Sequence, residues 1–207
     1  RTTGGTVRVH GAVFSPRHPR EAIATGVVMC PEDRQKEGII PMRSVMENTN
    51  LSARRRKAPG GSRGLINDRW EHENATERVA QLRVKTPSLR QAIRHLSGGN
   101  QQKVILGRWL SEAENLKVVL FDEPTRGIDV GAKSEIYAII QQLAKRGVAV
   151  IVVSSEMPEV IGVSDRVLVM RQGTVAAVLP RAEATEEILL KLALPVESDP
   201  LEQSNHE

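Results

Sequence analysis

Hydrophobic and polar positions form two patterns along the chain, and the first covers the early segments. Residues Thr6 to His10 alternate apolar and polar side chains and end at Gly11, which predicts a short strand, a turn and antiparallel pairing. A second apolar run, Gly26 to Cys30, stops at Pro31 and predicts another strand. Charged residues follow this strand directly, so we expect its end to carry a functional segment.

Two longer segments of the first half suit helices rather than strands. They run from Ser44 to Lys57 and from Arg69 to Leu82, with the glycine-rich loop Pro59 to Gly64 between them. We expect these helices to form a small helical subdomain, which spans about residues 44–112.

The second pattern consists of short, continuous apolar runs that alternate with helices. Strands are predicted over Lys117 to Phe121 and Val148 to Val153, with a helix over Ala132 to Lys145 between them. Such runs are typical of buried parallel strands joined by crossover helices. We therefore expect an open α/β sheet flanked by helices.

The last segments predict a hairpin, a helix and a tail. Val167 to Met170 and Thr174 to Val178 flank a tight turn, and a final helix is expected from about Thr185 to Leu192. The segment from Pro195 to Glu207 is acidic, polar and without periodicity, so it is predicted to be a disordered tail. Residues 1–194 are expected to form one domain.

Composition narrows the class of protein. Hydrophobic residues make up 40% of the 207 residues and charged residues 26%, which is typical of a globular chain. The single cysteine, Cys30, excludes an internal disulfide and a cysteine-based zinc site, and the reducing cytoplasm is the expected location. No apolar run reaches the roughly 18 residues that span a bilayer, so membrane contact would need a partner. Because the chain begins at Arg1, we expect upstream sequence to be missing.

The net charge of +4 and the basic run Arg54 to Lys57 could suggest nucleic acid. Aromatic residues are only 2% of the chain, so a stacking platform for single strands is almost absent. No helix-turn-helix or zinc pattern surrounds the basic run. We interpret it as a solvated face and expect no nucleic-acid partner.

The first chemical motif is the segment Leu96 to Lys103, which leads into an apolar helix. Ser97 is a good N-cap residue, and Gly98 and Gly99 allow a ligand to approach the backbone N–H groups that a first helical turn leaves unpaired. The helix dipole favours an anion at this position. The motif predicts a phosphate site, although an ordinary capped helix is the simpler alternative.

The second motif is the pair of carboxylates Asp122 and Glu123, which follows a predicted buried strand. Ligands of open α/β sheets bind at the carboxyl ends of strands, and carboxylates there suit Mg²⁺ and the activation of a water. We predict that Asp122 organises the metal and that Glu123 acts as the base. The alternative is an acidic N-cap for the next helix.

Together these motifs resemble the ATP-binding-cassette ATPases. The order of Leu96 to Gln102, Asp122 to Pro124 and Arg126 to Asp129 resembles that family's signature motif, Walker B strand and D-loop. The resemblance implies a P-loop-NTPase-like α/β fold with a helical signature subdomain, truncated at its N-terminus, and binding of ATP and Mg²⁺. Pro31 to Arg34 and the extension Asn100 to Lys103 resemble the second cassette of monosaccharide importers, with arabinose importers nearest.

Three departures from the family pattern affect this chain's own ATP site. The phosphate-binding pattern Gly-x-x-x-x-Gly-Lys-Ser/Thr does not occur, and the near match Gly127 to Ser134 is rejected because Ala132 replaces its second glycine. Ser155 stands where the family carries a catalytic histidine, and Glu32 stands where its Q-loop glutamine contacts metal and water. Ser155 can donate a hydrogen bond but carries no positive charge.

The resemblance also implies partners and a division of the site residues. Two cassettes pair head to tail in this family, so one set would serve the ATP of the partner cassette: Ser97, Gly98, Gly99, Asn100, Gln101 and Asp129. A second set would serve the site on this chain: Asp122, Glu123, Glu32 and Ser155. We expect the second site to be weak and the first set to be the chain's main contribution.

The further partners implied are a membrane permease, contacted by Ile39 to Asn50 at the cytoplasmic face of the inner membrane, and indirectly a periplasmic sugar-binding protein. The chain alone is not expected to hydrolyse ATP. A non-transport cassette ATPase associated with nucleic acid is the main alternative, and a purely structural half without catalytic use is a third.

Overall fold

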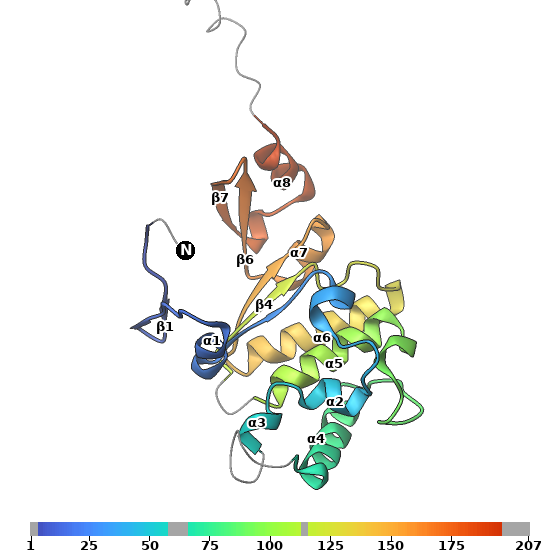
Figure 1. Cartoon of the computed structure of the whole chain (residues 1–207). Helices are drawn as coiled ribbons and strands as arrows, with labels where there is room; N and C mark the ends of the chain where they lie inside the picture. The colour runs from blue at the N-terminus through green and yellow to red at the C-terminus, as the bar shows by residue number, and fades with distance from the viewer. Residues whose placement is uncertain (1–3, 58–65, 113–115, 196–207) are drawn as a thin grey trace, which may run out of the picture. The chain divides into compact units, whose positions relative to one another are not determined.

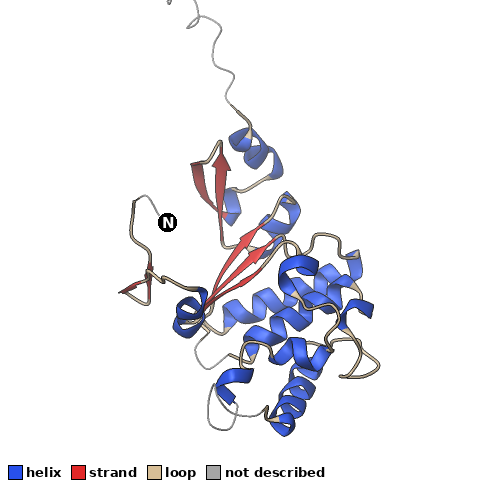
Figure 2. Ribbon diagram, in the orientation of Figure 1, coloured by secondary structure: helices blue, strands red, loops and turns tan. Residues whose placement is uncertain are grey.

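The computed structural model describes residues 4–57, 66–112 and 116–195. These residues fall into two compact units, which divide between Val153 and Ser154. Figures 1 and 2 show that helices predominate in the first unit and that a hairpin lies in the second. None of the helices in the described ranges has the length and apolar character needed to cross a membrane.

The first unit contains a parallel sheet of three strands. Its order is β3 (Val27–Cys30), β4 (Val118–Asp122) and β5 (Ala149–Val153). Two helices, α5 (Gly98–Leu110) and α6 (Val130–Lys145), pack against strands of this sheet, and α6 connects β4 to β5 as a crossover helix. The predicted α/β class and parallel sheet are confirmed.

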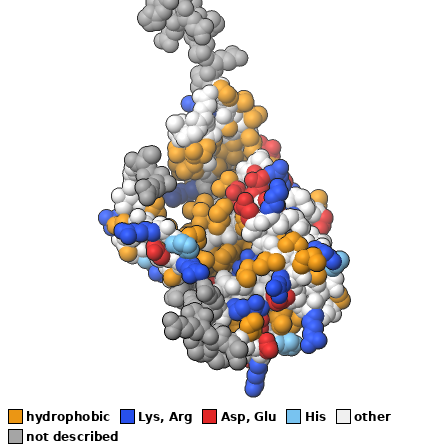
Figure 3. All heavy atoms as spheres, in the orientation of Figure 1, with side chains coloured by type: hydrophobic (Ala, Val, Ile, Leu, Met, Phe, Trp, Pro, Cys, Tyr) orange, Lys and Arg blue, Asp and Glu red, His pale blue; other side chains and the backbone are white. Residues whose placement is uncertain are grey.

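The two faces of this sheet are buried to different extents. On one face, Val28, Cys30, Val119 and Phe121 are buried. On the other face, Met29 is paired with Leu120 and Leu120 with Ile151, and the side chains of Met29 and Ile151 are 46% and 50% exposed. Figure 3 shows apolar side chains at the surface over this sheet. The prediction of fully buried strands is therefore wrong for one face, because the described residues of this unit leave it open.

The helical region consists of α2 (Val45–Asn50), α3 (Arg54–Lys57) and α4 (Asp68–Gln81), with α5 against α2 and α4. The helix predicted over Ser44 to Lys57 is two helices separated by a turn. α2 begins at a capping box in which Ser44 accepts a hydrogen bond from the Glu47 backbone and the Glu47 side chain accepts one from the Ser44 backbone. At the end of α2, the buried Asn50 amide donates to the Glu71 carbonyl of α4 at 2.9 Å. This contact favours a break because it fixes the end of α2 against α4.

The helix predicted over Arg69 to Leu82 is confirmed as α4, with Asn67 as its N-cap. Glu71 is buried in this helix and accepts a bidentate ion pair from Arg54. Arg54 therefore has a structural partner, and this part of the basic run is not a free cationic surface. The predicted loop from Pro59 to Gly64 lies outside the described residues.

The first unit also contains several short elements. The predicted antiparallel pair is confirmed as β1 (Arg8–Val9) and β2 (Ala12–Val13). Helix α1 (Pro19–Thr25), the π-helical turn η1 (Arg34–Gly38) and the 3-10 turn η3 (Ile93–His95) were not predicted. The turn η1 matters for the site because only Pro31, Glu32 and Asp33 separate it from β3.

The second unit contains α7 (Met157–Val163), β6 (Arg166–Arg171), β7 (Thr174–Pro180), the 3-10 turn η5 (Arg181–Glu183) and α8 (Glu186–Ala193). Strands β6 and β7 form the predicted hairpin, and α8 is the predicted last helix. Its small core comprises Val167, Val169, Ala184 and Leu189. The predicted tail lies outside the described residues except for Pro195.

Candidate functional site

The first candidate segment is the start of α5. The helix begins at Gly98 and Ser97 is its N-cap residue, with extended backbone angles (φ −62°, ψ 157°). The Ser97 side chain makes no capping hydrogen bond to the helix backbone. The serine hydroxyl therefore does not satisfy the first N–H groups of α5, which is the arrangement that a ligand-binding helix start requires.

The two glycines of this segment also permit close packing. A Cβ atom on Gly99 would lie 2.7 Å from Ala132 Cβ in α6, which is closer than carbon atoms pack. A Cβ atom on Gly98 would lie 3.0 Å from an Arg34 guanidinium nitrogen and 3.2 Å from the Gly127 carbonyl oxygen. The sequence assigned these glycines to ligand approach, and the structure gives each a second reason: Gly99 in the contact between α5 and α6, and Gly98 in the contact with Arg34 and Gly127.

Asn100 and Gln101 use their side-chain amides within the chain. Asn100 Oδ1 accepts from the Lys85 backbone N–H at 2.8 Å, and its Nδ2 donates to Ser97 Oγ at 2.9 Å. Gln101 is 3% exposed, and its amide donates to the Leu96 carbonyl and accepts from Gln35. The Gln101 amide is buried and used within the chain, so the geometry does not support the predicted nucleotide contact for Gln101.

The second candidate segment is the carboxyl end of β4, where Asp122 is the last strand residue and Glu123 follows it. Glu123 has a left-handed backbone (φ 44°), which is uncommon for a non-glycine residue and clusters at functional sites. Its N–H donates to the Val153 carbonyl at 2.8 Å, which holds the turn against the end of β5. Asp122 and Glu123 therefore lie at the carboxyl end of a parallel strand, as the sequence predicted.

The helix after β4, α6, is capped by a residue other than Asp122 and Glu123. Asp129 is the N-cap of α6, and its carboxylate accepts from the Ala132 N–H at 2.9 Å. The alternative in which Asp122 or Glu123 caps the next helix is therefore excluded. The near match Gly127 to Ser134 is mostly the first part of α6, so its residues from Val130 onward form a helix rather than a phosphate-binding loop.

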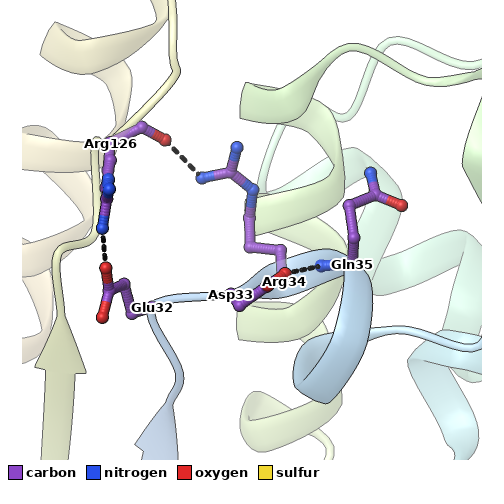
Figure 4. Close-up of a pocket in the computed structure, with 5 residues that line it drawn as sticks. All are labelled: Glu32, Asp33, Arg34, Gln35 and Arg126. Carbon is purple, nitrogen blue, oxygen red and sulfur yellow. Dashed lines mark hydrogen bonds and ion pairs between the residues drawn. The ribbon is translucent and has the colours of Figure 1, made fainter.

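Glu32 lies in a pocket of about 250 Å³ that the loops after β3 and β4 form together. Figure 4 shows that Arg126 points toward Glu32, with which it forms an ion pair, and that Arg34 reaches the same loop from η1. Arg34 donates to the Arg126 carbonyl oxygen at 2.8 Å, and burial lowers the pKa of Arg34. Glu32 therefore has a cationic partner, which the sequence analysis did not identify.

Arg34 and Arg126 are the site residues that the sequence analysis missed. Arg34 lies against Gly98 and Gly127, so it connects the segment after β3 with both candidate segments. The sequence did contain a signal for this pairing, because the acidic Glu32 and the basic Arg126 follow two predicted strands that could be neighbours in a sheet. The separation of 92 residues between Arg34 and Arg126 concealed it.

Ser155 lies in the second unit, two residues before α7, and is exposed. The neighbouring Ser154 Oγ accepts a hydrogen bond from the Glu156 N–H at 3.0 Å. The catalytic role of Ser155 stays a prediction.

The described residues offer a metal ion only part of a ligand set. In residues 4–57, 66–112 and 116–195, no three His, Cys, Asp or Glu side chains gather closely enough to hold a metal ion. Mg²⁺ is commonly held by one or two carboxylates together with waters and substrate phosphates. Asp122 therefore fits Mg²⁺ only as one ligand beside phosphate and water.

Solved structures of ATP-binding cassettes are similar to this chain in fold. The cassette MJ1267 aligns with a TM-score of 0.74 at 20% identity, covering 93% of this chain and 78% of that chain. The cassette MJ0796, solved as a dimer in a post-hydrolysis state with ADP and Pi, aligns with a TM-score of 0.68 at 21% identity, covering 86% and 74%. The predicted cassette-type α/β fold is confirmed.

Curated relatives are more similar in sequence, and they are longer proteins. The arabinose import ATP-binding protein AraG of Mannheimia succiniciproducens is 58% identical over 190 residues, which cover 92% of this chain and 37% of that protein. AraG of Ralstonia nicotianae is 54% identical over 202 residues, which cover 97% and 39%. The chain thus spans less than two fifths of the length of these relatives.

The family model described as ABC transporter matches residues 1–126, which is more than half of the chain and includes both candidate segments up to Arg126. The chain belongs to the ABC transporter family.

Proposed function

We propose that the chain is a nucleotide-binding part of an ATPase that drives the import of arabinose or a closely related monosaccharide. The observation that carries this proposal is the 58% identity to an arabinose import ATP-binding protein over 92% of the chain. In this proposal the chain lies at the cytoplasmic face of the inner membrane, bound to a permease that receives sugar from a periplasmic binding protein. The geometry of the two candidate segments supports a role in ATP chemistry.

The start of α5 serves the ATP that a partner cassette holds. Its first N–H groups and the positive end of the helix dipole favour phosphate oxygens, and Gly98 and Gly99 allow close approach. The Ser97 hydroxyl lies beside them and can add a hydrogen bond to an anionic oxygen. Asp129 supports this surface indirectly, because it caps α6 while Ala132 of α6 packs against Gly99.

The end of β4 supplies the acidic groups of this chain's own site. Glu123 acts as the base that takes a proton from the attacking water, and Asp122 holds Mg²⁺ through water. When bound, the metal neutralises charge on the phosphates. The left-handed backbone of Glu123 and the bond from its N–H to the Val153 carbonyl hold this residue at the carboxyl end of β4, and this preorganisation is what a positioned base requires.

The pairing of Glu32 with Arg126 supports the idea that this site is the weaker one. Glu32 brings a negative charge to a position near bound phosphates, and the ion pair offsets that charge within the chain. The signature segment is then the main contribution of the chain to ATP turnover.

The transport function is tested with the importer complex that contains this chain, reconstituted into vesicles with its permease and sugar-binding protein. We expect ATP supplied on the cytoplasmic side to drive uptake of labelled arabinose, and excess unlabelled arabinose to compete. No ATP-dependent uptake of any monosaccharide, together with salt-dependent binding of DNA or RNA, would instead favour the nucleic-acid-associated alternative.

We also propose that residues Ile39 to Asn50 contact the permease. The loop before α2 exposes apolar side chains, with Met42 69% and Ile40 42% accessible. Asn48 fixes this loop, because its Oδ1 accepts from the Ile40 N–H at 2.8 Å and its Nδ2 donates to the Ile40 carbonyl at 3.1 Å. A fixed, exposed apolar loop suits docking onto a membrane protein better than a solvated connection.

A Met42→Cys variant tests this contact by crosslinking within the assembled importer. We expect a short bifunctional reagent to link it to the permease. The unmodified chain is the matched control, because its Cys30 is buried and burial raises the pKa of that thiol to about 12. Crosslinks that reach only the partner cassette would refute the permease contact.

A further inference from the structure

The orientation of the Asn100 amide is fixed by the Lys85 backbone. A backbone N–H can only donate, so the amide atom that faces Lys85 N at 2.8 Å has to be the oxygen. The nitrogen of the same amide then faces Ser97 Oγ at 2.9 Å and can only donate to it. The whole amide is thereby oriented by a main-chain group in another segment.

This orientation decides how the Ser97 hydroxyl is used. A serine hydroxyl has one proton to donate and two lone pairs that accept. One lone pair accepts the Asn100 Nδ2–H, and the side chain makes no capping bond to the helix backbone. Ser97 is exposed, so its proton can be directed outward, away from Asn100.

A phosphate oxygen accepts hydrogen bonds, so a serine that serves it has to present its proton. A hydroxyl that rotated freely would lose rotational entropy when it bound phosphate. An amide that holds the oxygen as an acceptor removes the orientations in which the proton points into the protein. The bond from Asn100 thus prepares Ser97 as a donor.

We propose that Asn100 is a positioning residue that acts through Ser97, holding its hydroxyl so that the proton faces the ATP of the partner cassette. This inference rests on the proposed function. It assigns Asn100 a role other than the direct nucleotide contact expected from its place in the signature segment, because the oxygen and the nitrogen of its amide each bond a group of the chain itself.

A double-mutant cycle between Asn100→Ala and Ser97→Ala separates the two roles. The measurement is kcat and KM for ATP in the reconstituted importer complex. We expect Asn100→Ala to lower kcat/KM about tenfold in the presence of Ser97, as the loss of a well-aligned hydrogen bond to a charged group does. In the Ser97→Ala background the same change should cost less than about twofold, because the residue through which it acts is gone.

An Asn100→Asp variant separates positioning from support of the backbone. Its carboxylate can still accept the Lys85 N–H, so the free energy of unfolding should stay near that of the unchanged protein. Its second oxygen can only accept, which turns the Ser97 proton inward, so kcat/KM should fall at least as far as with Asn100→Ala. A purely structural Asn100 predicts that Asn100→Asp, whose added charge repels phosphate in either background, lowers kcat/KM equally with and without the Ser97 hydroxyl.

Asn67→Ala is a matched control. Asn67 also accepts a backbone N–H at the start of a helix, from Trp70 at 3.0 Å, but it belongs to α4 and not to the signature segment. We expect it to lower stability while kcat and KM for ATP remain unchanged.

The outcomes distinguish this inference from the proposed function. If Asn100→Ala costs the same in both Ser97 backgrounds, Asn100 does not act through Ser97 and only the positioning role is overturned. If Ser97→Ala leaves kcat/KM unchanged, the role of the signature segment across the cassette pair fails, and the positioning role fails with it.

Discussion

The start of α5 and the carboxyl end of β4 belong to the same compact unit, but they are supported differently. At the start of α5, Gly99 packs on α6, Asn100 is held by Lys85, and Gln101 is buried. The end of β4 lies where the parallel strands of the sheet have their carboxyl ends. One face of this sheet exposes apolar side chains such as Ile151. Beside the end of β4, Glu32 in the loop after β3 is paired with Arg126 from the loop after β4.

This difference indicates which half of the ATP chemistry the chain can provide by itself. The signature segment is positioned by contacts within one unit, so it can be presented to a partner as a preformed surface. The acidic groups at the end of β4 are proposed to act in catalysis, and the neighbouring Glu32 already has a cationic partner in Arg126. Changes at the start of α5 are therefore expected to have larger effects than changes at the end of β4.

Ser97→Arg should have the largest effect. The long cationic side chain blocks the approach of a partner's phosphate to the first turn of α5, and removing one preorganised donor alone costs about 10²–10³-fold. We expect ATP turnover of the importer complex to fall about a hundredfold or more, measured as phosphate release. Thr76→Arg, at an exposed hydroxyl of α4, is the control and should leave turnover unchanged.

Gly99→Ala tests whether the contact between α5 and α6 supports the signature segment. The new Cβ would lie 2.7 Å from Ala132 Cβ, so the helices have to separate, and overpacking of this kind costs about 1–3 kcal/mol. Urea unfolding should show this loss, and the double variant Gly99→Ala, Ala132→Gly should recover most of it. Gly131→Ala has room for its Cβ and should be neutral or slightly stabilising. Equal losses at both glycines would contradict this packing role.

Glu123→Gln should have a smaller effect on turnover than Ser97→Arg. Removing a general base from a site that performs all the chemistry typically costs about 10²–10⁴-fold. Because the partner's site carries most of the turnover in this account, we expect a loss of less than about tenfold in the importer complex. A loss larger than that of Ser97→Arg would reverse the comparison between the two segments.

Glu135→Gln should have the smallest effect, on stability at neutral pH. Glu135 in α6 accepts a 2.6 Å ion pair from Lys103, which is buried in α5, and this bond lowers the pKa of Glu135. The ion pair therefore stabilises the fold above the ordinary carboxyl pKa, and this contribution is lost as the pH falls through the lowered value. We expect less than about 1 kcal/mol at pH 7, since Glu135 is 42% exposed.

Urea unfolding at pH 7 and below pH 4 measures this effect, and the difference between wild type and Glu135→Gln should shrink at the lower pH. Glu73→Gln is the control, because the ion pair between Glu73 and Arg69 is fully on the surface of α4. A difference for Glu135→Gln that grows as the pH falls would contradict the assigned direction.

The sequence predicted the local elements of the fold well, because they depend on patterns of neighbouring residues. The strand before Asp122, the helix after Ser97 and the hairpin after Val167 were found from such patterns. The division of the segment from Ser44 to Lys57 into two helices was missed, because it depends on the contact of Asn50 with a helix that is distant in sequence.

The candidate site shows the same limit. The residues of both motifs could be identified from the sequence, since each motif is continuous. Their supports could not, because Arg126 reaches Glu32 and Lys85 reaches Asn100 only through the tertiary fold. The exposed face of the sheet was also missed, since a continuous apolar run reads the same whether one face or both are covered.

The most direct test of the central claim is ATP turnover by this chain mixed with the first cassette of the same importer, compared with either protein alone. The account predicts turnover well above the sum of the two in the mixture, and loss of this increase with Ser97→Arg. A mixture no more active than the first cassette alone, or an increase that survives Ser97→Arg, would contradict the claim that the chain completes a partner's ATP site through its signature segment.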